Sequence, residues 1–372
     1  MTNKTSPSLF SLALQGVQGL TPYEPGKPIE EVERELGISN IIKLASNENP
    51  LGMSPKAKEA IKATIDDAYL YPDGNAFNLK VALSKKHGVE FNQLTIGNGS
   101  NDILEIVARC FADANSEIMY SQYAFAVYPI LTQGIGARHN MVPAKDWGHD
   151  LTAMLNAITP ETKIIFIANP NNPTGTYLLK SEIASFLSQI PSNIIVVMDE
   201  AYHEFISNDD YCSAEAFLSL YPNLIVSRTF SKVYGLAGLR IGYALSHPDI
   251  CNILNRVRQP FNANMLALVA AEAALSDEEF LKASVELNNY GLRQLADGFD
   301  ALGLTYIPSV ANFIAVDVNQ PGSLIYQALL QKGVIVRPIG GYKMPNHIRV
   351  SVGTESENKL FLTALEKILK VS

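Results

Sequence analysis

The stretch Ser227-Arg-Thr-Phe-Ser-Lys-Val-Tyr-Gly-Leu-Ala-Gly-Leu-Arg240 follows an apolar run and is centred on Lys232. Small hydroxyl residues and glycines surround this lysine, and an arginine ends the stretch. Such surroundings suit an amine that bonds covalently to an aldehyde cofactor, with Ser231 and Arg240 as donors to an anionic group. Most lysines are solvated surface charges, so the stretch becomes informative together with two motifs that precede it.

Both preceding motifs follow apolar runs that read as buried strands. Asn169-Pro-Asn-Asn-Pro-Thr-Gly175 ends the run 163–168, and its prolines, asparagines and glycine predict an irregular loop. Asp199-Glu-Ala-Tyr202 closes the run 193–198. Ligands of open α/β sheets bind at the carboxyl ends of strands, so we expect Asn172 and Asp199 at one site. A polar turn would explain the first motif equally well on its own.

A carboxylate at the end of a buried strand has little water around it, and it needs a cationic partner or it will protonate. A pyridinium N–H is such a partner for Asp199, although an arginine in a structural ion pair would serve too. Tyr202 lies close enough along the chain to reach a phenolic oxygen of the same ring. An attachment lysine with an acidic partner is the requirement of pyridoxal 5′-phosphate (PLP). The three motifs together therefore predict PLP attached to Lys232.

A glycine-rich turn, Gly97-Asn-Gly-Ser-Asn-Asp102, lies between a predicted strand at 94–97 and a predicted helix at 102–111. This junction leaves the backbone N–H groups of Gly99, Ser100 and Asn101 free at a helix N-terminus, where anions bind. A short glycine pattern is weak on its own. Beside the lysine motif it predicts the cup for the cofactor phosphate.

These motifs, in this order, resemble the fold-type I PLP enzymes of the aspartate aminotransferase superfamily. The resemblance extends to segments that look like the histidinol-phosphate aminotransferase family: Leu20–Gly26, Lys43–Gly52, Tyr71–Gly74, Val336–Pro338 and Ile348–Thr354. It therefore spans roughly residues 20 to 370. It implies an α/β fold with a mainly parallel sheet covered by helices on both faces, plus a smaller α+β domain.

The resemblance implies roles for the residues that match the family motifs. Lys232 would hold the cofactor and act as the general base, and Asp199 would pair with the ring nitrogen. The other implied cofactor contacts are Asn172 and Tyr202 at the phenolic oxygen, Phe125 on the ring face, Gly99, Ser100, Ser231 and Arg240 at the phosphate, together with Asn101, Thr229 and Tyr71. In the family this tyrosine comes from the neighbouring subunit, so a homodimer with shared active sites is implied. Without the resemblance, Phe125 would read as a core aromatic and Tyr71 as a turn residue.

Substrate contacts are implied for four further residues. Arg349 would grip the substrate carboxylate, Arg337 and Tyr23 would line a second anion site, and Asn47 would lie near the substrate amine. The implied reaction transfers an amino group between L-histidinol phosphate and 2-oxoglutarate, giving imidazole-acetol phosphate and glutamate, in histidine biosynthesis. An aromatic-amino-acid aminotransferase and a phosphothreonine decarboxylase remain alternatives, because they share much of this pattern.

Composition limits the partners. The 372 residues are 47% hydrophobic and carry a net charge of −8, which argues against nucleic acid or an anionic membrane surface. We expect no membrane span, signal peptide or metal site, since the chain has no long apolar run and its six histidines are scattered. Three distant cysteines predict free thiols and a cytoplasmic location. A ligand-sensing domain of a transcription regulator is disfavoured, because only about forty residues precede Leu44.

The hydrophobic pattern predicts three regions. Residues 1–45 would form an irregular N-terminal arm and part of the small domain, 46–280 the large PLP-binding domain, and 281–372 the small C-terminal domain. Helices alternate with short strands from about 54 to 275, which is typical of a parallel sheet. Beyond it we expect helices at 277–302, 323–331 and 355–370, with strands at 311–316 and 348–352.

Overall fold

The computed structural model describes residues 9–22 and 26–370. Its largest sheet has seven strands in the order β2-β8-β7-β6-β5-β3-β4, and only β8 runs antiparallel to its neighbours. The strands are β2 (Leu94–Gly97), β3 (Glu117–Ser121), β4 (Arg138–Val142), β5 (Thr162–Ala168), β6 (Ile195–Asp199), β7 (Leu224–Thr229) and β8 (Gly242–Ser246). The mainly parallel sheet confirms the expected α/β class.

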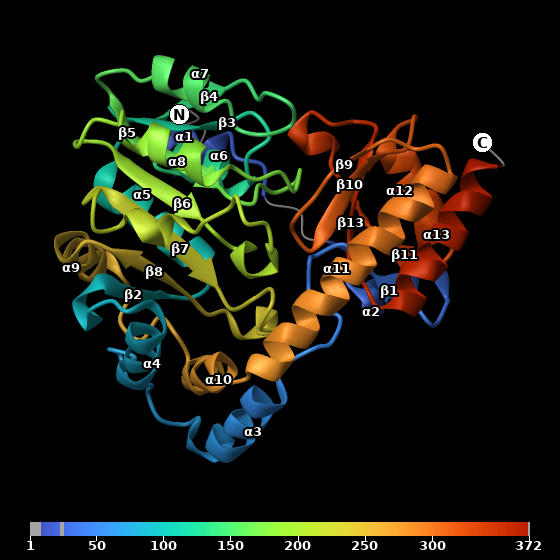
Figure 1. Cartoon of the computed structure of the whole chain (residues 1–372), viewed down its shortest axis with the longest axis horizontal. Helices are drawn as coiled ribbons and strands as arrows, with labels where there is room; N and C mark the ends of the chain where they lie inside the picture. Colours follow the sequence, from blue (N-terminus) through green and yellow to red (C-terminus); the bar gives the residue numbers. More distant parts are fainter. Residues whose placement is uncertain (1–8, 23–25, 371–372) are drawn as a thin grey trace, which may run out of the picture.

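Helices cover both faces of this sheet (Figure 1). Along β5, Ile165 and Ile167 pack into one apolar cluster, while Ile164 and Phe166 pack into the other, as the two-residue period of a strand requires. The first face is covered by α3 (Pro55–Thr64), α4 (Phe77–His87), α7 (Leu151–Asn156), α8 (Lys180–Leu187) and α10 (Met265–Leu275). The second is covered by α5 (Ser100–Phe111), α6 (Val127–Gly134) and α9 (Pro248–Val257).

Two smaller sheets lie at the far end of the long helix α11 (Glu278–Ala301), which starts beside α10 (Figure 1). One is antiparallel, in the order β12-β13-β10-β9, and the other pairs β1 with β11 in parallel. Their strands are β1 (Ile42–Lys43), β9 (Tyr306–Ile307), β10 (Phe313–Asp317), β11 (Val334–Ile335), β12 (Arg337–Pro338) and β13 (His347–Ser351). Helices α12 (Gly322–Leu330) and α13 (Glu355–Leu369) pack on them. The three domain boundaries stay a prediction.

The N-terminal arm is more ordered than expected. A 3₁₀ turn (Leu9–Leu12), α1 (Gln15–Gln18) and α2 (Ile29–Leu36) lie within its described part. Pro28 precedes α2 with φ −65°, a value that a helix start tolerates, and Val32 packs against Ile335 of β11. The expectation of an irregular arm was therefore wrong for these segments, because proline interrupts a helix interior and not its first turn.

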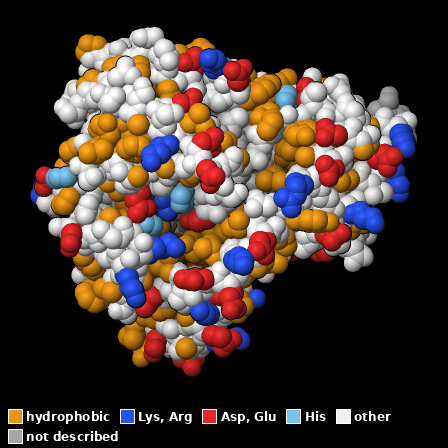
Figure 2. Space-filling view, in the orientation of Figure 1, with side chains coloured by type: hydrophobic (Ala, Val, Ile, Leu, Met, Phe, Trp, Pro, Cys, Tyr) orange, Lys and Arg blue, Asp and Glu red, His pale blue; other side chains and the backbone are white. Residues whose placement is uncertain are grey.

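Short 3₁₀ turns connect several elements of the large sheet and the smaller ones. They are Ile65–Asp67, Phe91–Gln93, His203–Phe205, Ala214–Phe217, Ala237–Leu239 and Gly340–Tyr342. Among residues 9–22 and 26–370, no helix is long and apolar enough to cross a membrane. On the face drawn in Figure 2, acidic and basic side chains are interspersed.

Candidate active site

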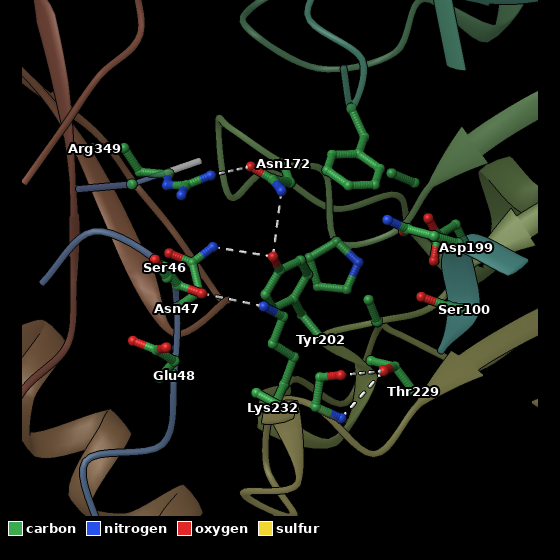
Figure 3. A pocket seen from close by; sticks show the side chains of 18 of the residues that line it. Ser46, Asn47, Glu48, Ser100, Asn172, Asp199, Tyr202, Thr229, Lys232 and Arg349 are labelled. Atoms are coloured by element: carbon green, nitrogen blue, oxygen red, sulfur yellow. Dashed lines mark hydrogen bonds between the residues drawn. The ribbon is translucent and has the colours of Figure 1, made fainter. Parts of the chain in front are cut away.

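A cavity of about 290 Å³ opens where the carboxyl ends of β5, β6 and β7 face β13 of the antiparallel sheet. Thirteen of the residues expected at the site line it: Asn47, Ser100, Asn101, Phe125, Asn172, Asp199, Tyr202, Thr229, Ser231, Lys232, Arg240, Arg337 and Arg349. Both the large sheet and the smaller sheets thus contribute to one site. Lys232, Asp199, Tyr202, Asn172 and Arg349 appear together in Figure 3.

Lys232 projects into this cavity. Its Nζ donates a hydrogen bond to the backbone carbonyl of Ser46 at 3.3 Å and lies 5.6 Å from the centre of the Tyr202 ring. Burial, together with the nearby positive charges of Arg349 and Arg240, lowers the pKa of Lys232 to about 8. A neutral amine, the form that attacks an aldehyde, is therefore accessible near neutral pH.

Asp199 ends β6 and is almost fully buried, with 4% of its surface exposed. The hydroxyl of Tyr128 donates to its Oδ2 at 2.9 Å, whereas Oδ1 has no hydrogen-bond partner among the described residues. Burial raises the pKa of Asp199 to about 6. A buried acceptor without a partner is costly. The geometry therefore suits one further donor, and a cationic donor would keep the carboxylate ionised.

A chain of hydrogen bonds crosses the cavity from the small sheet to the large one (Figure 3). Arg349 donates to the Oδ1 of Asn172 at 2.6 Å and to the backbone carbonyl of Ala45 at 2.9 Å. The amides of Asn172 and Asn47 both donate to the Tyr202 hydroxyl, at 3.3 and 3.0 Å. Burial raises the pKa of Tyr202 to about 12, so its hydroxyl stays protonated and can donate a hydrogen bond to a ligand oxygen.

At the other end of the cavity, donors and a helix start lie together. Arg240 donates to the Oγ of Ser231 at 3.3 Å, and that oxygen also accepts from the Thr229 hydroxyl at 3.0 Å. Gly99 precedes α5 with φ +81°, and a Cβ there would collide with the guanidinium of Arg240. Only glycine fits this approach. The first residue of α5, Ser100, lines the same cavity, so amide, hydroxyl and guanidinium donors surround one point.

Two of the expected residues do not line the cavity. Tyr71 is 81% exposed and stacks on Phe261 with ring centres 4.8 Å apart, so it does not line the cavity of its own chain. Tyr23 lies outside the described residues. Gly99 contacts Arg240 without lining the cavity. Phe125 does line it, against the edge of Tyr128. The roles assigned to these residues stay predictions.

Two contributions were missed in the sequence. Tyr128 is fully buried and holds Asp199, yet a tyrosine in an apolar segment has no distinguishing pattern. The buried ion pair between Arg228 and Glu200, at 2.9 Å, ties the ends of β7 and β6 together behind the cavity. Both of its residues stand inside the quoted motifs. Neighbouring residues at a strand end face opposite sides of the sheet, so a charged residue next to a site residue points away from the cavity. The charges of Glu200 beside Asp199 and of Arg228 beside Thr229 could therefore have indicated an ion pair behind the site.

Known proteins resemble this chain along nearly its whole length. The class I and II aminotransferase family matches residues 39–365. Histidinol-phosphate aminotransferase 1 of Nitrosococcus oceani is 55% identical over 361 residues, covering 97% of this chain and 98% of that protein. Histidinol-phosphate aminotransferase 2 of Pasteurella multocida is 56% identical over 360 residues, covering 97% and 99%. The crystal structure of histidinol-phosphate aminotransferase from Sinorhizobium meliloti in complex with pyridoxal-5′-phosphate has a TM-score of 0.89 at 30% identity, covering 98% and 100%.

Proposed function

The chain belongs to the class I and II aminotransferase family, and from that premise we propose that it is a histidinol-phosphate aminotransferase. It transfers an amino group between L-histidinol phosphate and 2-oxoglutarate, with imidazole-acetol phosphate and glutamate as the other pair, in histidine biosynthesis. Its cofactor is pyridoxal 5′-phosphate. The observation that carries the cofactor assignment is the unpartnered Oδ1 of Asp199 in the same cavity as Lys232, which fits a protonated pyridine ring.

The cavity also offers donors for the rest of the cofactor. The hydroxyl of Tyr202 and the amide of Asn172, which are hydrogen-bonded to each other, would bind its phenolic oxygen, while Arg240 and Ser231, also hydrogen-bonded to each other, would bind its phosphate. When bound, PLP supplies an electron sink for the negative charge that remains when a substrate carbon loses its proton. The carboxylate of Asp199 would accept a hydrogen bond from the protonated ring nitrogen, and its negative charge would keep that sink effective.

Lys232 carries out the proton transfer. With the cofactor bound, the free amine of Lys232 would act as the general base that takes the proton from the substrate carbon and returns it elsewhere. Its lowered pKa of about 8 suits this task, because an efficient base has a pKa near the working pH. Borohydride reduction of the yellow holoenzyme should fix the cofactor onto Lys232. A reducible catalytic attachment to another lysine in the Lys232→Ala protein would contradict the assignment.

The substrate anion is assigned to Arg349 and Arg337. Arg349 has an Nε without a hydrogen-bond partner among the described residues, although it is only 6% exposed. A guanidinium that is already oriented by Asn172 and Ala45 can receive a carboxylate at little further ordering cost. Arg337 lines the same cavity and supplies the second cationic group that a phosphorylated substrate needs.

The direct test compares two amino acceptors side by side. Glutamate should donate its amino group to imidazole-acetol phosphate with a much higher kcat/KM than to phenylpyruvate. Activity on phenylpyruvate alone would assign the chain to the aromatic aminotransferases instead.

We also propose a homodimer in which Tyr71 of each chain reaches the cofactor phosphate of the other. Its exposed ring, outside the cavity of its own chain, supports this arrangement. Mixing Tyr71→Phe chains with Lys232→Ala chains should restore activity, since one of the two sites in a hybrid dimer is then intact. A fully active monomer would refute the shared site. The unpaired cysteines Cys110, Cys212 and Cys251 support a location in the cytoplasm.

A further inference from the structure

A continuous set of hydrogen bonds links the phosphate cup to the segment that carries Tyr71. In the cup, the backbone N–H of Asn98 donates to the Oδ2 of Asp102 at 2.8 Å. The same oxygen accepts from the Nδ2 of Asn262 at 2.7 Å, and this amide also donates to the backbone carbonyl of Ile96 at 3.1 Å. Asn262 therefore holds both the strand that enters the cup and the helix that leaves it.

Arg258 continues these contacts to the second segment. It donates to the Oδ1 of Asn262 at 2.7 Å and to the backbone carbonyl of Gly74 at 2.9 Å. Its Nε donates to the Oδ1 of Asn255 in α9 at 3.0 Å, which fixes the guanidinium plane. Each of its three nitrogens thus has an acceptor inside the chain. The residue is committed to holding segments together and does not line the cavity.

Packing reinforces the same connection. Phe261 lies between Arg258 and Asn262 and has a φ of +55°, which is unfavourable for any residue other than glycine. This conformation places its ring on Tyr71, with centres 4.8 Å apart, and against Gly74, where a Cβ would meet it at 3.3 Å. One short segment, residues 258–262, therefore contacts Tyr71 and Gly74 as well as Ile96 and Asp102, which flank the cup.

We propose that Arg258 and Asn262 are positioning residues that join the phosphate cup of one active site to the tyrosine segment lent to the other. This inference rests on the proposed dimer and cofactor. Each subunit's cup serves its own cofactor, whereas its Tyr71 serves the neighbour's cofactor. Loosening Arg258 in one chain then weakens phosphate binding at both sites of the dimer, although Arg258 touches neither cofactor.

The test uses hybrid dimers with a single Lys232-bearing site. In the first hybrid, Arg258→Met and Lys232→Ala are on the same chain, so the remaining site has an intact cup and receives Tyr71 from the altered chain. In the second hybrid they are on different chains, so the remaining site has the altered cup and an intact lent tyrosine. The readout is the rate at which PLP leaves the holoenzyme in the presence of an aldehyde trap, followed by its absorbance.

We expect PLP release to be roughly tenfold faster in both hybrids than in a wild-type/Lys232→Ala hybrid, as for the loss of one charge-assisted hydrogen bond. Asn262→Ala, which removes the middle of the connection, should reproduce the effect. Arg256→Met is the matched control, because this exposed arginine of α9 contacts only Asn252 of the same helix in the described hydrogen bonds. It should leave release unchanged.

Acceleration in only one hybrid would overturn the coupling, because it would confine Arg258 to the cup or to the tyrosine segment. Unchanged release in both hybrids, for Arg258→Met and for Asn262→Ala, would overturn the positioning role altogether. A chain that attaches no PLP at Lys232 would instead refute the proposed function. Normal release from Tyr71→Phe dimers would refute the shared site, so these failures are distinguishable.

Discussion

Replacing Asp199 by asparagine is the sharpest test of the site, because it removes one charge and almost no volume. The amide oxygen of the substituted side chain would still accept the hydrogen bond from Tyr128, but a neutral amide could not form an ion pair with a protonated ring nitrogen. Two unit charges about 4 Å apart attract by about 4 kcal/mol at an effective dielectric constant of about 20. If that attraction supports the transition state, the single-turnover rate should fall roughly a thousandfold.

The measurement is the single-turnover rate with histidinol phosphate on protein that is saturated with PLP. Tyr128→Phe keeps the charge of Asp199 and removes one hydrogen bond from it, so the single-turnover rate should fall only about tenfold. Asp209→Asn, at an exposed position, is the control and should behave as wild type. A fully loaded Asp199→Asn enzyme within about tenfold of the wild-type rate would refute the ion-pair reasoning.

The same substitution separates function from stability. Burial raises the pKa of Asp199 to about 6 in the folded apoprotein, above its pKa in the unfolded chain. The contribution of this titration to the stability of the fold is therefore complete below the pKa of the unfolded chain, and it is lost as the pH rises through about 6. At pH 8 the wild-type apoprotein therefore carries a buried charge without its partner. Asp199→Asn apoprotein should melt at the same or a higher temperature there. A clearly lower melting temperature would indicate that the carboxylate supports the fold.

Three further outcomes follow from other residues. The rate of PLP attachment to apoprotein should rise about tenfold per pH unit and level off above about 8, where Lys232 is neutral, and a plateau that starts only above pH 10 would contradict its lowered pKa. Arg337→Gln should lower kcat/KM for histidinol phosphate by roughly 10- to 100-fold, because losing a charge-assisted hydrogen bond to the phosphate costs about 1.5–3 kcal/mol. It should lower kcat/KM for phenylalanine less, and equal losses on both substrates would show that Arg337 does not bind the phosphate. Arg228→Leu should lower the free energy of unfolding, measured in urea, by about 3–5 kcal/mol, because it leaves Glu200 buried without its ion-pair partner. A decrease below about 1 kcal/mol would show that Glu200 finds another partner.

Much of this site could be predicted from local sequence. Lys232, Asp199 and Asn172 each follow a short apolar run, and parallel strands bring the ends of such runs to one edge of the sheet. Gly99 could be predicted too, since a strand, a glycine and a helix start form an anion site from contiguous residues. These predictions depend only on periodicity within an element and on the order of elements, which are properties of the chain itself.

What depended on the tertiary structure are the contacts between distant segments. Arg349 meets Asn172 across 177 residues, and Asn47 meets Tyr202 across 155. The free oxygen of Asp199 is recognisable only once Tyr128 is known to occupy the other one. Likewise, the stacking of the exposed Tyr71 on Phe261 joins two segments that are far apart in the sequence. The physical reason is that local propensities set the direction of a side chain relative to its own strand or helix, whereas its partner depends on how separate elements pack.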